Sequence, residues 1–247
     1  NPTDDNIRKN LLDRVNAAQY PVLLITVDVP TFGYRPRDIK NGLAMPPKMS
    51  LNNILQMLSC PQWLFETAMA GKPEMKILMP YMPKAMPTEQ LAEFMNKTVM
   101  GRVDMEGLKP IRDYWKGPMV IKGLINETDV AKAVTLGADA VVISNHGARQ
   151  LDAGESPVEP LQRAAQLYGN KIKIFMDSGL RSGSNIAGAL ALGADFTFLG
   201  RPFMYGVGAL GEKGGVHTIN LLKRQLTQIM NQLGCAQISE LPKHLVK

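Results

Sequence analysis

Short apolar runs alternate with segments of helical period along most of this chain. The first run extends from Pro21 to Val29 and is rich in β-branched residues. Four similar runs follow, at Met119–Lys122, Ala140–Ser144, Ile172–Asp177 and Phe196–Gly200. Such continuous runs are typical of strands that are buried on both faces. Helical-period segments lie between them, at Glu127–Leu136, Pro157–Leu167 and Ser184–Leu192. The alternation predicts parallel β/α units.

Amphipathic helices are predicted near both ends of the chain. Near the start, Thr3 is a candidate N-cap, and the following Asp4 and Asp5 suit the positive end of a helix dipole. A second helix is expected from about Val216 to Leu233, where apolar residues recur on one face, and Gly234 is its expected stop.

The predicted fold class is α/β, a (β/α)8 TIM barrel that is incomplete here. A complete barrel takes about 250 residues, and this chain has 247, yet only five of eight strands are found. The space is taken by residues 41–116, where eight of the fifteen methionines fall between Met45 and Met86 and seven prolines between Pro46 and Pro87, around short helical patterns such as Leu51–Leu58. We expect one domain over residues 1–247, the C-terminal portion of a barrel with a long insertion after its first strand, and the missing strands either upstream or on another chain.

Composition excludes several classes of protein. The apolar runs are too short to span a bilayer. Cys60 and Cys235 are the only cysteines and have no metal-ligand spacing around them, so neither a disulfide framework nor a metal site is expected. The net charge of +6 comes from dispersed Lys and Arg without an aromatic-basic stripe. Anionic small molecules or lipid surfaces therefore fit better as partners than nucleic acid.

Reactive side chains stand where the predicted strands end. In a parallel barrel the active site forms at these ends, because the βα-loops converge there. The residues at or just after the five strand ends are Thr26, Asp28, Arg35, Lys122, Ser144, His146, Arg149, Asp177, Gly200 and Arg201. Each one alone is consistent with a solvated loop, but their recurrence at every strand end favours an active site.

His146 and Arg149 lie three residues apart on one loop. An imidazole titrates near neutrality, which suits a general base. A guanidinium can bind a carboxylate in a bidentate manner and so orient a hydroxy acid toward that base. We interpret this pair as the catalytic centre.

Lys122 leaves two functions open. An ammonium at the end of a buried strand needs an anionic partner. It could stabilise the negative charge of a reduced flavin, or act as the Schiff-base nucleophile of an aldolase or lyase. Two Gly- and Arg-containing turns, Asp177–Gly183 and Gly200–Pro202, each precede a helix, as expected of a phosphate site after the last two strands of a barrel. This favours the flavin.

The sequence resembles the FMN-dependent 2-hydroxy-acid dehydrogenases and oxidases, a family that includes L-lactate dehydrogenase, mandelate dehydrogenase, glycolate oxidase and flavocytochrome b2. The most specific motif is SNHG-x-RQLD at Ser144–Asp152. Supporting motifs are TVD-x-P at Thr26–Pro30, GYR-x-RD-x-KN at Gly33–Asn41, IKG at Ile121–Gly123 and LGRP at Leu199–Pro202. The resemblance covers nearly the whole chain. Where the family usually has glycine or arginine, this chain has Ala148, Ser178 and Ser182.

The resemblance implies oxidation of an L-2-hydroxy acid to the 2-oxo acid, with L-lactate as the first candidate and mandelate or glycolate next. It assigns His146 as the base, Asp28 as its supporting carboxylate, and Arg149 and Arg35 as the residues that bind the substrate carboxylate. The flavin contacts that it implies are Thr26, Lys122 and Ser144 for the ring, and Asp177, Gly179, Arg181, Gly200 and Arg201 for the ribityl chain and phosphate.

The remaining partners also follow from the resemblance. Electrons would pass to a quinone, a cytochrome or oxygen, and the protein would be a homo-oligomer, a tetramer by analogy. The segment 43–87 is either a peripheral membrane contact or a lid, so we expect a cytoplasmic protein with a possible position on the inner face of the cell membrane. Two alternatives stay open, the Lys122 aldolase and a barrel fragment without catalytic activity.

Overall fold

The computed structural model describes residues 2, 4–31, 33–44, 49–71, 75–83, 86–98 and 101–246. The chain divides into two compact units, one of residues 1–14 and 31–102, and the other of residues 15–30 and 103–247. The long helix α1, Asp5–Ala17, spans the boundary. Thr3, the expected cap of this helix, lies outside the described residues. Asp4 caps it instead, because its Oδ1 accepts hydrogen bonds from the amides of Asn6 and Ile7 at 2.8 and 3.2 Å.

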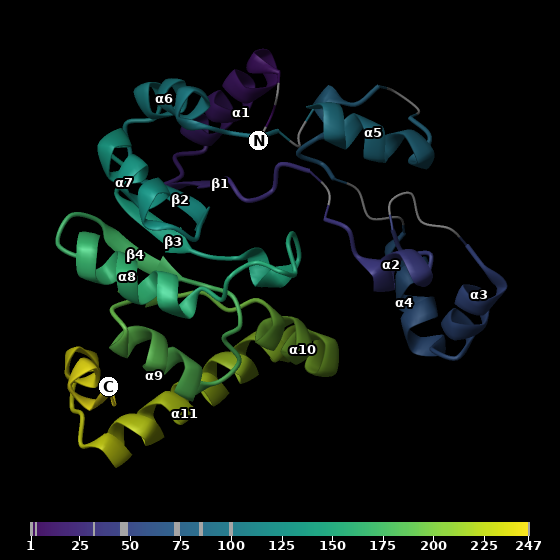
Figure 1. Ribbon diagram of the computed structural model, residues 1–247. Helices are drawn as coiled ribbons and strands as arrows, with labels where there is room; N and C mark the ends of the chain where they lie inside the picture. Colours follow the sequence, from purple (N-terminus) through teal and green to yellow (C-terminus); the bar gives the residue numbers. More distant parts are fainter. Residues whose placement is uncertain are drawn as a thin grey trace. The chain divides into compact units, whose positions relative to one another are not determined.

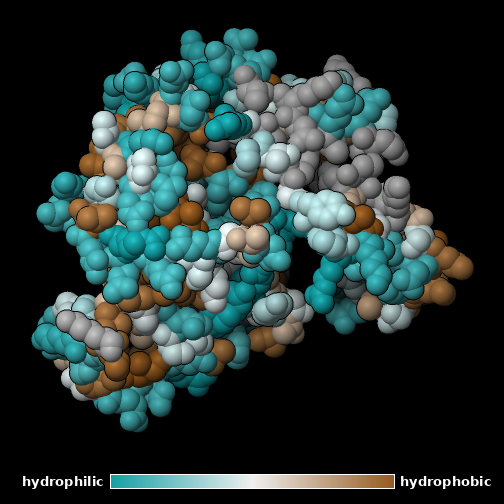
Figure 2. All heavy atoms as spheres, in the orientation of Figure 1, coloured by the Kyte–Doolittle hydropathy of each residue, from teal (hydrophilic) through white to brown (hydrophobic). Residues whose placement is uncertain are grey.

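The first unit contains helices and no strand among its described residues. Its elements are α2 (Pro36–Lys40), α3 (Leu51–Leu58), α4 (Pro61–Ala70), the 3-10 turn η1 (Met79–Tyr81) and α5 (Thr88–Thr98). The bounds of α3 are those that the helical pattern predicts. Ser50 starts α3, since its side chain accepts a hydrogen bond from the amide of Asn53 at 3.2 Å. Apolar atoms gather over α3 in Figure 2.

The second unit is built on five parallel strands in the order β1-β2-β3-β4-β5 (Figure 1). The strands are β1 (Leu23–Thr26), β2 (Met119–Leu124), β3 (Ala140–Ile143), β4 (Lys173–Met176) and β5 (Phe196–Thr197). The helices are α6 (Met105–Tyr114), α7 (Glu127–Leu136), α8 (Val158–Tyr168), α9 (Gly183–Ala191), α10 (Arg201–Leu210) and α11 (Gly214–Leu233), with the 3-10 turns η2 (His146–Ala148), η3 (Gly211–Lys213) and η4 (Ile238–His244). Five parallel strands with intervening helices confirm the partial TIM barrel.

Most strands are shorter at their carboxyl ends than the apolar runs predict. The runs continue to Val29, Ser144, Asp177 and Gly200, whereas the strands end at Thr26, Ile143, Met176 and Thr197. The chain leaves the sheet there because the following residues turn into the loops that carry polar side chains. Strand β2 is the exception and extends to Leu124.

The register of the sheet divides the strand residues between two faces. Thr26 pairs with Lys122, and Lys122 pairs with Val142, so these three residues share one row and one face. Alternation along each strand puts Ser144 and Asp177 on that same face. The opposite face carries fully buried apolar side chains, among them Val141, Ile143 and Ile174, all at 0% exposure. A rigid apolar layer thus supports the polar row at the strand ends.

The last helices of the second unit pack around one apolar cluster. Ala187 and Ala191 of α9 pack with Cys235 and Leu241, and side chains of α11 cover this cluster. The helix α11 ends as predicted at Gly234, which has a φ of 70° and donates its amide to the last turn. Within the described residues, no helix is long and apolar enough to cross a bilayer.

Candidate active site

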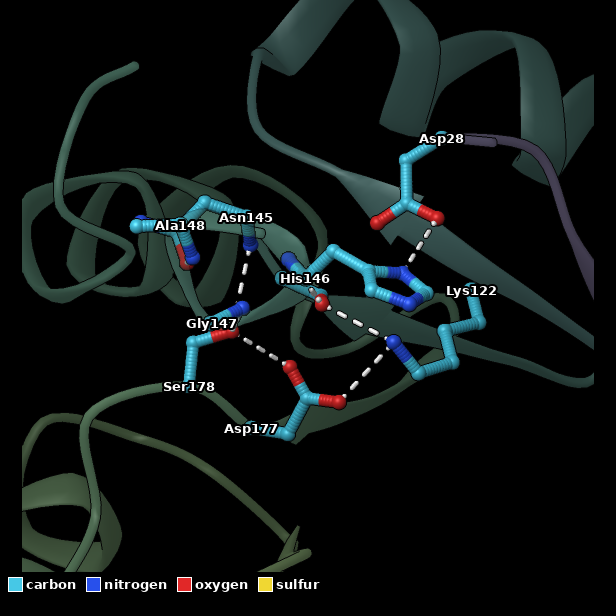
Figure 3. A network of polar contacts seen from close by, with 9 residues as sticks. Asp28, Lys122, Asn145, His146, Gly147, Ala148, Asp177 and Ser178 are labelled. Atoms are coloured by element: carbon cyan, nitrogen blue, oxygen red, sulfur yellow. Dashed lines mark hydrogen bonds and ion pairs between the residues drawn. The ribbon is translucent and has the colours of Figure 1, made fainter. Parts of the chain in front are cut away.

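His146 and Asp28 form a hydrogen-bonded pair at the ends of β3 and β1 (Figure 3). His146 Nδ1 lies 3.0 Å from Asp28 Oδ1, although the residues are 118 positions apart in sequence. A carboxylate only accepts hydrogen bonds, so Nδ1 carries the proton in the neutral imidazole and Nε2 keeps its lone pair. The pair therefore has the arrangement of a general base held in one tautomer by a carboxylate.

Gly123 makes room for this carboxylate. It lies in β2 at a bulge, where the register with β3 shifts between Lys122 and Leu124, and its φ is +104°. A Cβ on Gly123 would stand 2.4 Å from Asp28 Cγ, closer than any real carbon contact. The bulge and the missing side chain together let Asp28 reach His146.

Lys122 donates to two oxygens at the end of the sheet. Its Nζ lies 2.9 Å from Asp177 Oδ2 and 3.0 Å from Ser144 Oγ. Ser144 is 1% exposed, and its Oγ also accepts the amide of His146 at 3.1 Å. Lys122 therefore forms an ion pair with a carboxylate, as an ammonium does, whereas a Schiff-base nucleophile attacks with the lone pair of the neutral amine.

Two further residues, Ser178 and Arg201, hold the loop of His146. Ser178 Oγ accepts hydrogen bonds from the amides of Asn145 and Gly147 at 3.3 and 2.9 Å. The guanidinium of Arg201 donates to Gly147 O at 3.0 Å. The loop after β3 is thus held by residues that follow β4 and β5.

These groups surround a cavity of about 470 Å³. Its lining includes Lys122, His146, Arg149, Asp177, Gly179, Arg181, Gly200 and Arg201. Helix α10 begins at this cavity, and no side chain caps its first turn, so its amides are available to an anion. The first turn of α9, by contrast, is capped by Ser182. An uncapped helix start between two arginines suits a phosphate group.

The comparison with known protein families shows to which family the chain belongs. The FMN-dependent dehydrogenase family matches over residues 1–247. The chain belongs to this family.

Its relatives in this FMN-dependent dehydrogenase family include L-lactate dehydrogenases. That of Vibrio cholerae is 35% identical over 241 residues, and that of Haemophilus influenzae is 36% identical over 245 residues. These matches cover 97% and 98% of this chain and 64% of each relative. The chain therefore spans about two thirds of the length of these relatives.

Solved structures agree with the family. The monotopic membrane protein (S)-mandelate dehydrogenase superposes with a TM-score of 0.91 at 33% identity, covering 98% of this chain and 64% of that one. A lactate oxidase of Pediococcus acidilactici superposes with a TM-score of 0.78 at 28% identity, covering 100% and 59%. FMN is the cofactor of the family, and one solved mandelate oxidase carries an FMN adduct.

The residues present fit FMN. The volume of the cavity lies within the range of about 300–1,000 Å³ that is usual for ligand pockets. Its cationic side chains and the free end of α10 match a phosphate, and Lys122 is a cation of the kind that offsets the negative charge of a reduced flavin. Asp28 Oδ2 is buried and has no hydrogen-bond partner among the described residues. A polar group at this strand end would satisfy it.

Most of the residues expected at the site lie together in the second unit. Arg149 is exposed and lines the cavity with His146, whereas Thr26 and Ser144 are not among the described residues of its lining. Arg35 belongs to the first unit, where its guanidinium lies 3.8 Å from Asp38 Oδ2. Its role toward the substrate stays a prediction.

Sequence reasoning missed the functions of Gly123 and Ser178. Gly123 appears within the IKG motif, but the motif gives no sign that its missing side chain accommodates Asp28. Ser178 appears only as a departure from the glycine that is usual in the family. A serine in a turn that usually holds glycine was the one available signal for the contacts of its hydroxyl.

Proposed function

We propose that the protein oxidises an L-2-hydroxy acid to the 2-oxo acid with FMN as the oxidant. The observation that carries this proposal is the His146–Asp28 pair, at 3.0 Å, with Arg149 on the same loop at a cavity that fits FMN. Lys122 as a Schiff-base nucleophile is disfavoured by its ion pair with Asp177, because that reaction needs the neutral amine. A barrel fragment without activity is disfavoured by the assembled polar site.

The residues would act on the substrate as follows. Arg149, with Arg35 as the second guanidinium, binds the substrate carboxylate and orients C2. His146 Nε2 takes the proton of the C2 hydroxyl, and Asp28 stabilises the imidazolium that forms. FMN, when bound, would supply the two-electron oxidation that converts the 2-hydroxy acid to the 2-oxo acid.

The proposed cofactor contacts fall into two groups. We assign Lys122, Thr26 and Ser144 to the side of the flavin ring. The ribityl chain and phosphate are assigned to the residues after β4 and β5, namely Asp177, Gly179, Arg181, Gly200 and Arg201. The lining of the cavity and the uncapped start of α10 support this division.

L-lactate is the proposed substrate, because the relatives at 35% and 36% identity are L-lactate dehydrogenases. L-mandelate is the second candidate, since the solved structure with the TM-score of 0.91 is a mandelate dehydrogenase. The test is the visible spectrum of the FMN-loaded protein, recorded without oxygen before and after each of L-lactate, L-mandelate and glycolate. We expect L-lactate to bleach the flavin at a lower concentration than L-mandelate or glycolate does. A flavin that none of the three acids bleaches would contradict the proposal.

We also propose that segment 43–87 contacts a membrane surface. The helices α3 and α4 expose apolar side chains, with Leu58 60%, Phe65 68% and Met69 74% accessible. The similar (S)-mandelate dehydrogenase is a monotopic membrane protein. A position on the inner face of the cell membrane would suit electron transfer to a quinone or a cytochrome, with oxygen as the alternative acceptor. A homo-oligomer is the assembly that we expect.

A further inference from the structure

Ser178 has a backbone conformation that serine rarely adopts. It follows β4 and has a φ of +75°, in the left-handed region that favours glycine. Such a conformation at a non-glycine residue persists only where other contacts hold it, and it is found most often at functional sites. The contacts of the Ser178 hydroxyl are therefore the place to look for its purpose.

The hydroxyl makes three hydrogen bonds. It accepts from the amides of Asn145 and Gly147, which stand on either side of His146. It donates to Asp177 Oδ1 at 2.8 Å, and this leaves Asp177 Oδ2 for the ammonium of Lys122. Figure 3 shows Ser178 beside Gly147, with Asp177 between it and Lys122. One hydroxyl thus ties the loop of the proposed base to the Lys122–Asp177 ion pair.

A glycine at position 178 would relieve the backbone but leave these groups unpaired. The amide of Gly147 has no other acceptor among the described residues, and the bonds to Ser178 are partly buried. Without them, the His146 loop would keep its contacts with Asp28, Ser144 and Arg201 but lose both hydrogen bonds to the turn after β4. The conformation of Ser178 is strained, and its hydroxyl is the feature that offsets this strain.

We propose that Ser178 is a positioning residue that fixes the loop of His146 and the direction of the Asp177 carboxylate. The inference rests on the proposed function, in which His146 is the base. Ser178 itself touches no reacting atom in this scheme. It acts by holding His146 Nε2 at a fixed place relative to the substrate hydroxyl, and by keeping Lys122 paired with Asp177 on the side of the flavin ring.

Two substitutions separate the hydroxyl from the backbone. Ser178→Gly removes the hydroxyl and the strain, whereas Ser178→Ala removes the hydroxyl and keeps the strain. Ser184→Ala is the matched control, because Ser184 lies in the same segment and its hydroxyl contacts only Ser182 among the described residues. The thermal unfolding curve of each variant checks that it is folded.

Two readouts test the inference on the same proteins. Amide hydrogen exchange at Asn145 and Gly147 should rise about tenfold in both Ser178 variants, as expected when local hydrogen bonds are lost. The rate constant of anaerobic flavin reduction at saturating substrate should fall about tenfold in both, because the base is less well positioned. Ser184→Ala should change neither quantity.

The outcomes distinguish a failure of the inference about Ser178 from a failure of the proposed function. If exchange is unchanged in both variants, or rises while the reduction rate stays at the wild-type value, Ser178 is not a positioning residue. A rate that falls in Ser178→Ala but not in Ser178→Gly would assign the effect to the backbone and would also overturn the inference. A wild-type flavin that no 2-hydroxy acid reduces would count against the proposed function, and the exchange data remain measurable in that case.

Discussion

The two units of this chain use apolar residues in opposite ways. In the second unit the strand residues Val141 and Ile143 are 0% exposed. In the first unit Leu55 of α3 and Phe65 of α4 are 58% and 68% exposed, and the described residues of these helices bury no hydrophobic side chain. An apolar pattern therefore predicts burial only where neighbouring elements supply a covering surface. The parallel strands have such a covering surface. Among the described residues, the pair α3 and α4 does not.

The glycines show the same difference. At Gly123 in the second unit, an added Cβ would stand 2.4 Å from Asp28. At Gly71, which ends α4 in the first unit with a φ of +77°, an added Cβ meets no atom within 4 Å. Packing around Gly123 is close, so a small change there should reach the chemistry. At Gly71 the positive φ, and not a neighbouring atom, disfavours a side chain.

The largest expected effect is on stability. Ile143→Ala opens a cavity behind the polar row and should lower the free energy of unfolding by about 2–5 kcal/mol. Leu55→Ala, in the exposed face of α3, should change it by less than about 0.5 kcal/mol. Urea unfolding of both variants and of the wild-type protein measures the difference. Equal losses would show that α3 is as well covered as the strands.

The next effect is on catalysis. Gly123→Ala pushes a methyl group against Asp28, so the His146 contact should be displaced and the rate of flavin reduction should fall about 100-fold. Gly188→Ala is the matched control, because Gly188 lies inside α9 and an added Cβ there meets no atom within 4 Å. That variant should react at the wild-type rate and be slightly more stable. Anaerobic stopped-flow absorbance gives both rates, and a normal rate in Gly123→Ala would refute the tight fit.

A smaller effect is expected at a lipid surface. Phe65→Ser removes one exposed apolar side chain of α4, and binding to lipid vesicles should weaken about tenfold, since burial of such a side chain contributes about 1.5–3 kcal/mol. Asn52→Ser, at an exposed polar position of α3, is the control. Vesicle co-sedimentation measures the partition of each variant. If neither variant differs from the wild-type protein, the apolar face of α3 and α4 serves another purpose.

The smallest effect concerns a capping carboxylate at the end of the second unit. The amides of Gln237 and Ala236 donate to Glu240, and these hydrogen bonds lower the pKa of its carboxyl group below the ordinary value of 4.5. A lowered pKa in the folded state means that the carboxylate stabilises the fold above pH 4.5 and that this contribution is lost as the pH falls through the lowered value. Glu240→Gln should therefore unfold at a slightly lower temperature than the wild-type protein at neutral pH. The difference in unfolding temperature should disappear at acidic pH. A difference that stays constant with pH would exclude the Glu240 carboxylate as its cause.

Much of the fold could be predicted from apolar periodicity. The helices Leu51–Leu58 and Glu127–Leu136 begin and end where the pattern places them. Strand ends were overestimated, because residues such as Val29 continue the apolar run after the strand has ended. The polarity of a residue does not show whether its backbone still belongs to the sheet.

The candidate site could be predicted as a set of residues but not as a geometry. The strand-end rule brings His146 near Asp28 without giving their contact. The bulge at Gly123 and the positive φ of Ser178 depend on how two loops meet in space, and no local pattern encodes that meeting. These two residues therefore emerge only from the structure.

The most direct test of the central claim is the rate of anaerobic flavin reduction in His146→Gln. Glutamine keeps a polar side chain at the site but cannot serve as a base, so the variant should retain FMN while its reduction by L-lactate slows by about 100- to 10,000-fold. Reduction at the wild-type rate, with FMN still bound, would show that the proton of the substrate hydroxyl goes elsewhere and that the His146–Asp28 pair is not the catalytic base.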